Sequence, residues 1–175
     1  IAIRTSNAGE SGVSGVLSFS SGTTSSGSSG SIILGTGTAT TGKGGDISLS
    51  VGSGNLAAGG DITLSAGQST TDTGGGVWIT AGVGTATSSG AVAIRTSNAG
   101  AAGVSGVLSF SSGTTSSGSS GSIILGTGTA TTGKGGDISL SVGSGNLAAG
   151  GDITLSAGQS TTDTGGGVWI TAGVG

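Results

Sequence analysis

The chain has 175 residues and a net charge of −3, and 43 of its residues are Gly, whereas His and Cys are absent. Without an imidazole or a thiol, the sequence excludes Ser-His-Asp and Cys-His catalysis, disulfides and the usual zinc ligand sets. With seven acidic and four basic residues, the chain has no excess positive charge to attract nucleic acid. No apolar run approaches the roughly 18 residues of a membrane span.

The sequence consists of two nearly identical copies. Residues 1–84 recur as residues 92–175, with substitutions at only three of the paired positions. We expect a first repeat over residues 1–90, which lacks its first residue, and a second over residues 91–175, whose last line is shortened. Because such copies arise by duplication, we expect the chain to be a segment of a longer array.

Each repeat divides at Gly-rich boundaries into six lines of about fifteen residues. In the first repeat the lines are residues 1–15, which are positions 2–16 of a sixteen-residue line, and residues 16–30, 31–45, 46–60, 61–75 and 76–90. Positions 2 and 4 of each line are aliphatic or Phe, and the last position is Gly, as in GGDISLSVG and GGDITLSAG, which begin at Gly44 and Gly59. This alternation predicts one short strand at the start of every line, followed by a Gly-containing turn.

Strands of this kind bury their apolar side only when they stack on one another. We therefore predict an all-β fold, a β-solenoid (parallel β-helix) with about 15 residues per coil and six coils per 91-residue repeat. The two repeats would form one continuous solenoid. Its core stack in the first repeat would comprise Ile3, Leu17, Phe19, Ile32, Leu34, Ile47, Leu49, Ile62, Leu64, Val77 and Ile79.

A second interpretation of the same composition is a disordered, low-complexity chain. Richness in Gly, Ser and Thr is typical of such chains. The mean hydropathy of +0.31 and the regular spacing of the large aliphatic residues favour the solenoid instead.

Four Asp residues follow Gly-Gly at the start of a line, and they are the candidate metal ligands. In a stack, neighbouring carboxylates would lie about 5 Å apart, a like-charge ladder that a Ca²⁺ ion would relieve. The alternative is that each Asp caps the backbone N–H groups of its turn, with Lys43 and Lys134 as counter-charges. We favour capping and expect no metal; the weak Ca²⁺ candidates are Asp46, Asp61, Asp137 and Asp152.

Large apolar residues at position 3 of a line should point away from the core. Trp78, Trp169, Ile33 and Ile124 are therefore candidates for lateral contacts between neighbouring chains. The alternative is that they are scattered exposed residues of the kind found on any protein surface. Arg4 and Arg95, at position 5, could pair with an Asp of a neighbouring chain.

No catalytic constellation or cofactor motif is present. Asp and Ser are plentiful but have no base partner, and GKGG at residues 42–45 lacks the hydroxyl residue of a phosphate-binding loop. We expect no enzyme activity, no catalytic residue and no cofactor. Exposed Ser and Thr runs such as TTSSGSSG, residues 23–30, are plausible sites for O-linked glycans.

The lines GGDITLSAG and SSGAVAIRTSNAG resemble those of the very long Ser/Thr/Gly-rich β-solenoid repeat proteins of microbial and algal cell surfaces, including large adhesins. The resemblance implies an extracellular or cell-surface location. We expect a structural protein that forms a fibre, filament or stalk by coil stacking, with copies of itself as partners, end to end and laterally. Two alternatives stay open: an ice-binding solenoid, and the spacer region of a large adhesin.

Overall fold

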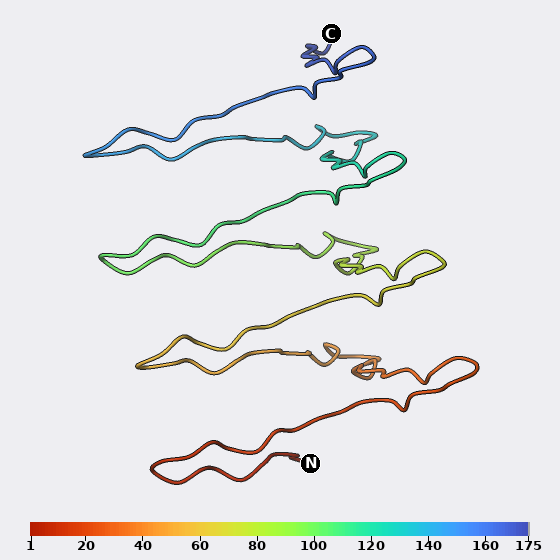
Figure 1. Cartoon of the computed structure of the whole chain (residues 1–175), viewed down its shortest axis with the longest axis vertical. Coiled ribbons are helices and arrows are strands. Elements are labelled where there is room, and N and C mark those ends of the chain that lie inside the picture. The colour runs from red at the N-terminus through yellow and green to blue at the C-terminus, as the bar shows by residue number, and fades with distance from the viewer. Residues whose placement is uncertain (175) are drawn as a thin grey trace. The chain divides into compact units, whose positions relative to one another are not determined.

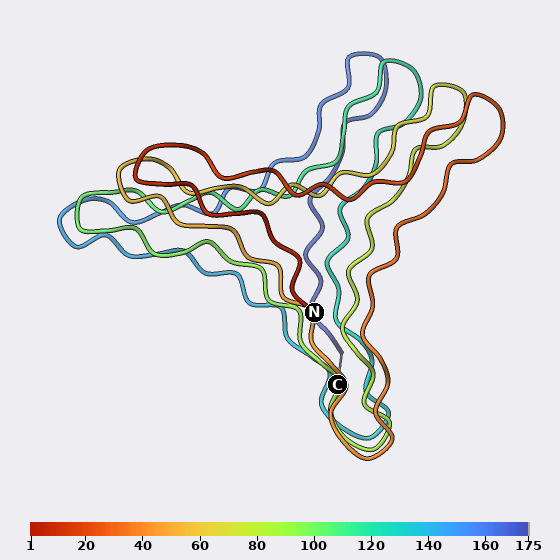
Figure 2. The same ribbon diagram turned by 90° about the horizontal axis from the view of Figure 1, so that it is seen from below.

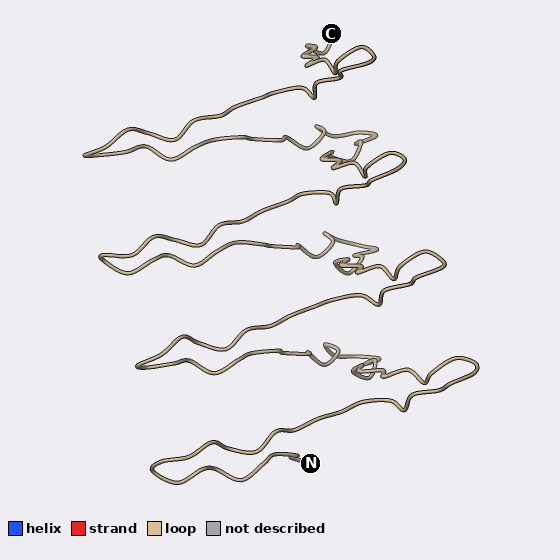
Figure 3. Cartoon of the chain, viewed as in Figure 1, coloured by secondary structure: helices blue, strands red, loops and turns tan. Residues whose placement is uncertain are grey.

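The computed structural model of the chain describes residues 1–174, which are irregular coil throughout. They contain no helix and no strand (Figure 3). The chain divides into two compact units, Ile1–Ala91 and Val92–Gly175. The prediction of an all-β solenoid is therefore wrong for the part of the chain that the structure describes.

Each fifteen-residue line instead bends back on itself. In the first unit the chain bends at residues 10–12, 25–27, 40–42, 55–57, 70–72 and 85–87. In the second unit it turns at residues 101–102 and bends at residues 116–118, 131–133, 146–148 and 161–163. The trace of each line runs out to its bend and returns (Figures 1 and 2). The sequence repeat is therefore visible in the backbone as a repeated bend rather than as a repeated strand.

Backbone hydrogen bonds show why no sheet forms. The Gly60 N–H donates to the Gly52 carbonyl at 3.2 Å, and the Gly75 N–H donates to the Gly67 carbonyl at 2.9 Å. Each bond joins position 7 of a line to position 15 of the same line, across the bend. The same bond recurs at 2.9–3.1 Å for Gly90 with Gly82, Gly151 with Gly143 and Gly166 with Gly158. A parallel sheet needs bonds between lines, and none joins two lines among residues 1–174.

Glycine permits this closure because it lets the two limbs of a line approach closely. A Cβ atom added at Gly75 would lie 3.3 Å from the Gly67 nitrogen, and one added at Gly90 would lie 3.4 Å from the Gly82 nitrogen. Gly also weakens strands, since it loses more backbone entropy on ordering than any other residue. With 43 Gly residues in the chain, closing a line locally competes well with pairing it to the next line.

The predicted core is absent from the described residues, none of which is buried. The chain exposes 17068 Å² of surface. A folded monomer of this mass would expose about 7,300 Å² and a fully extended chain about 23,000 Å². The aliphatic pattern determines only which side chains share a side of a line. A solenoid core also needs a second line that covers these side chains, and the pattern does not provide it. Residues 1–174 also include no helix that could cross a membrane.

Candidate functional site

The aliphatic residues predicted to form a core stack lie on the surface, with an exposure that depends on their position in the line. Ile47 and Ile62, at position 2, are 49% and 50% exposed. Leu49 and Leu64, at position 4, are 70% and 73% exposed. The remaining members, all at position 2 or 4, are exposed to between 49% and 74%: Ile3, Leu17, Phe19, Ile32, Leu34, Val77 and Ile79. We call the residues at positions 2 and 4 of all lines the aliphatic columns.

The four candidates for lateral contact are more exposed than the predicted core residues of the first repeat. Ile33 and Ile124 are 91% and 89% exposed, and Trp78 and Trp169 are 89% and 90% exposed. The difference follows the two-residue alternation of the sequence, since these residues occupy position 3, between the two columns. Each line therefore presents a less exposed apolar side and, in some lines, a fully exposed large residue on the other.

Each indole ring lies against the backbone of its own line. A Cβ atom added at Gly76 would lie 3.0 Å from the Trp78 Nε1 atom, and one added at Gly167 would lie 2.8 Å from the Trp169 Nε1 atom. Because Gly76 and Gly167 carry no Cβ atom, the ring edge can approach the backbone at these positions without a steric clash. Trp78 and Trp169 nevertheless remain 89% and 90% exposed, so both rings are accessible from solvent.

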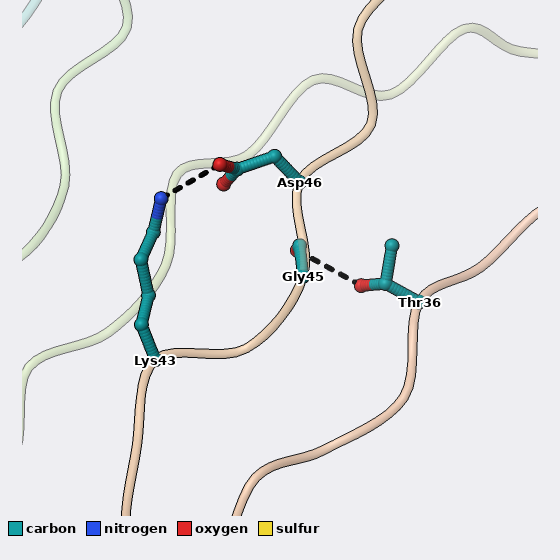
Figure 4. Close-up of polar contacts among 4 residues, drawn as sticks. All are labelled: Thr36, Lys43, Gly45 and Asp46. Carbon is teal, nitrogen blue, oxygen red and sulfur yellow. Dashed lines mark hydrogen bonds and ion pairs between the residues drawn. The ribbon is translucent and has the colours of Figure 1, made fainter.

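The first candidate metal ligand, Asp46, forms an ion pair instead. The Lys43 Nζ atom lies 2.7 Å from the Asp46 Oδ2 atom, and both side chains are exposed (Figure 4). Lys134 and Asp137 repeat the pair at 2.7 Å. Exposed pairs of this kind stabilise a fold by about 0–1 kcal/mol. Their main effect is that the Lys and Asp side chains neutralise one another.

The other two candidate ligands, Asp61 and Asp152, make no ion pair and no side-chain hydrogen bond among residues 1–174. Within the same range, no three acidic side chains gather into a group that could hold a metal ion. The structure thus does not bring the four Asp residues together, and it leaves two of these carboxylates facing solvent.

A hydroxyl closes the line that contains Lys43. The Thr36 Oγ1 atom donates a hydrogen bond to the Gly45 carbonyl at 3.0 Å (Figure 4). Thr127 and Gly136 repeat this bond at 3.0 Å. In these two lines the side-chain bond takes the place of the backbone bond between positions 7 and 15.

Side chains also hold several of the bends, which the sequence analysis did not anticipate. The Asp72 N–H donates to the Ser69 Oγ atom at 2.9 Å, and the Thr73 N–H donates to the Asp72 Oδ1 atom at 2.7 Å. At another bend, the Ser26 N–H donates to the Thr24 Oγ1 atom at 3.3 Å. Ser, Thr and Asp with a backbone N–H two or three residues later are typical of such turns, so the S-x-x-D spacing at residues 69–72 was the signal to use.

A shallow hollow near the start of each repeat is lined by residues that donate hydrogen bonds. In the first unit it has a volume of about 330 Å³ and is lined by Arg4, Thr5, Ser6 and Asn7. In the second unit it has a volume of about 390 Å³ and is lined by Arg95, Thr96, Ser97 and Asn98. A guanidinium, two hydroxyls and a side-chain amide offer several donors at one place, and this combination suits an anionic group.

Comparison of the chain with protein-family models, with curated proteins and with solved structures finds no match.

Proposed function

We propose that this chain is a structural, non-enzymatic repeat that associates with copies of itself, and that it does so through the aliphatic columns. The observation that carries the proposal is the 17068 Å² of exposed surface, with every large aliphatic side chain of residues 1–174 at least about half exposed. Soluble monomers rarely expose contiguous apolar patches larger than a few hundred Å². An apolar surface that recurs in every line is better explained by a partner than by water.

The energetics favour association strongly. Covering a Leu, Ile or Val side chain that was exposed contributes about 1.5–3 kcal/mol. A stable interface buries about 1,200–2,000 Å² in total, and the chain exposes roughly 10,000 Å² more than a folded monomer of its mass. Several lines can therefore be covered by a second copy while others remain available for a third, which is the condition for an extended assembly.

A second copy of the chain is the favoured partner, because its surface carries the same aliphatic columns and can cover them. The aliphatic columns have the same spacing along the sequence in all lines, since the lines share one pattern. Lines from two copies therefore present complementary spacings without further specialisation. Such an assembly is a fibre, filament or stalk, located outside the cell or on its surface. The resemblance to long cell-surface repeat proteins supports the same proposal.

The alternatives have less support. Ice binding needs a flat, regular array of Thr side chains, and residues 1–174 contain no strand on which to build one. A spacer in a large adhesin would use the same extended chain and differs only in what the chain is attached to. Bound glycans would occupy the exposed Ser and Thr residues at the bends.

Sedimentation velocity over a dilution series tests the proposal. We expect the sedimentation coefficient to rise with protein concentration in the micromolar range, and the larger species to dissociate on dilution. A chain that sediments as a monomer at every concentration up to about 1 mM would show that the aliphatic columns have no partner among copies of the chain, and self-association would be abandoned.

A further inference from the structure

We propose that Arg4 and Arg95 bind the carboxylates of Asp61 and Asp152 in a second copy of the chain, and that these ion pairs set the alignment of associated chains. The inference rests on the proposed self-association and adds a single defined alignment, which the aliphatic columns cannot provide. Because those columns repeat in every line, they permit many alignments of nearly equal energy. Charged residues that occur once per repeat distinguish one alignment from the others.

The charge inventory singles out the two Arg residues. The chain has four basic residues. Lys43 and Lys134 are occupied, since each forms an ion pair of 2.7 Å within its own line. Neither Arg4 nor Arg95 forms an ion pair with the described residues of its own unit. The Arg residues are thus the cations available to a second chain.

The surroundings of these Arg residues suit a carboxylate. Each lines the hollow described above, where two hydroxyls and the amide of Asn7 or Asn98 add further donors. A guanidinium binds a carboxylate through two parallel N–H···O bonds, which fixes direction as well as distance. A hollow with a volume of about 330–390 Å³ has room for an Asp side chain together with the backbone that carries it.

Elimination identifies the acidic partner. Asp46 and Asp137 are bound by Lys43 and Lys134. Glu10 has no counterpart in the second repeat, where Ala101 stands in its place, so it cannot give a contact that recurs.

Two further acidic residues lie at bends and already accept hydrogen bonds. Asp72 and Asp163 hold their bends, since each accepts a hydrogen bond of 2.7 Å from the backbone N–H of the next residue. Asp61 and Asp152 are left, with no hydrogen-bond or ion-pair partner for their carboxylates among residues 1–174.

The repeat makes the two contacts cooperative. Arg4 precedes Asp61 by the same number of residues as Arg95 precedes Asp152. Each repeat therefore offers the same pair of charges to a second copy of the chain. The second pair then forms at a high effective concentration, so two weak exposed pairs act together.

The test compares two double variants that change the net charge equally. Arg4→Gln with Arg95→Gln removes the proposed contacts, whereas Lys43→Gln with Lys134→Gln removes only the pairs within lines. We expect the Arg variant to weaken association about tenfold at low ionic strength, and the Lys variant to weaken it less than about twofold. The association constants are measured by sedimentation equilibrium at about 20 mM and about 500 mM salt, and the difference between the variants should shrink at the higher salt concentration.

A charge exchange provides an independent readout. A chain with Arg4→Asp and Arg95→Asp should associate with a chain carrying Asp61→Arg and Asp152→Arg. It should associate less tightly with a control chain carrying Asp72→Arg and Asp163→Arg, which has the same net charge.

The outcomes separate this inference from the proposed function. If the wild-type chain associates but the Arg and Lys variants weaken it equally, or if the exchanged chain and its control associate equally well, then the ion pairs do not align the chains and the inference is overturned while self-association stands. If the wild-type chain does not associate at all, both fall.

Discussion

The Thr36 hydroxyl donates a hydrogen bond to the Gly45 carbonyl at 3.0 Å, nine residues further along the chain and on the opposite limb of the same line. The bond shows the rule by which this chain is organised. The lines at residues 31–45, 46–60, 61–75 and 76–90 each close across their bend, with Gly or Thr at the closing position, and their aliphatic residues remain uncovered.

Removing the hydroxyl should open this line. Thr36→Val with Thr127→Val keeps the size of the side chain but loses the donor to the Gly45 and Gly136 carbonyls. We expect the nuclear Overhauser contacts between the methyl groups of residue 36 and the Gly45 α-protons to weaken severalfold, because a hydrogen bond of this kind contributes only about 1 kcal/mol and has no packing to replace it.

Thr38→Val with Thr129→Val is the matched control, since neither hydroxyl makes a hydrogen bond among residues 1–174. Unchanged contacts in the variant without the Thr36 and Thr127 hydroxyls would mean that these hydroxyls do not close their lines.

The bend at residues 55–57 should be sensitive to a single methyl group. A Cβ atom at Gly54 would collide with the Ala57 carbonyl oxygen. Gly54→Ala should therefore displace the bend and break the bond from the Gly60 N–H to the Gly52 carbonyl. Exchange of the Gly60 amide hydrogen should become about threefold to tenfold faster.

Gly52→Ala serves as the control for this variant, because a Cβ atom there meets nothing within 4 Å and the carbonyl acceptor is kept. If both variants leave exchange at Gly60 at the wild-type rate, the described bend is not what protects that amide.

A charge placed in an aliphatic column should weaken association more than the same charge beside it. Leu49→Asp with Leu140→Asp removes two side chains that are each 70% exposed in the single chain and available to a partner. Since covering each Leu contributes about 1.5–3 kcal/mol, we expect the dissociation constant to rise by at least tenfold. Ser48→Asp with Ser139→Asp adds equal charge next to the column and should change it by less than about threefold. Equal effects in sedimentation equilibrium would contradict a contact made through the columns.

The Trp residues should report lateral contact between chains. Trp78 and Trp169 are 89% and 90% exposed in the single chain. Acrylamide should therefore quench the fluorescence of the dilute chain almost as well as that of free indole, and the quenching constant should fall by half or more as the chains associate. Association without any change in quenching would leave the Trp residues outside the contact and make them ordinary exposed residues.

The sequence predicted the division into lines but not their fold. The bends follow the fifteen-residue spacing of the Gly-rich segments, and the lower exposure of Ile47 than of Ile33 follows the alternation. Alternation states which side chains share a side of the chain. It does not state whether the backbone bonds within a line or between lines, and that choice depended on Gly52 and Gly60 lying close enough to bond across the bend. Richness in Gly, which is typical of irregular chains, was the better guide to the secondary structure.

The candidate site was predictable in part. Trp78 was singled out from its position in the line, and Arg4 from its potential to pair with another chain. Lys43 was named as a counter-charge for the Asp residues, but the direct contact with Asp46 depends on how the chain turns through the two intervening Gly residues. The role of Ser69 in its bend was also missed, since attention to the repeated aliphatic residues left the turn chemistry of Ser, Thr and Asp unused.

The most direct test of the account is amide hydrogen exchange in the aliphatic columns of the dilute, unassociated chain. In the described structure the backbone N–H groups of Ile47, Leu49, Ile62 and Leu64 donate to no backbone carbonyl of residues 1–174. We predict that these amides exchange within about threefold of the rates for an unstructured peptide of the same sequence. Protection by more than about a hundredfold in the single chain would show that neighbouring lines are paired after all, and would contradict the view that each line closes on itself and leaves its aliphatic side for a partner.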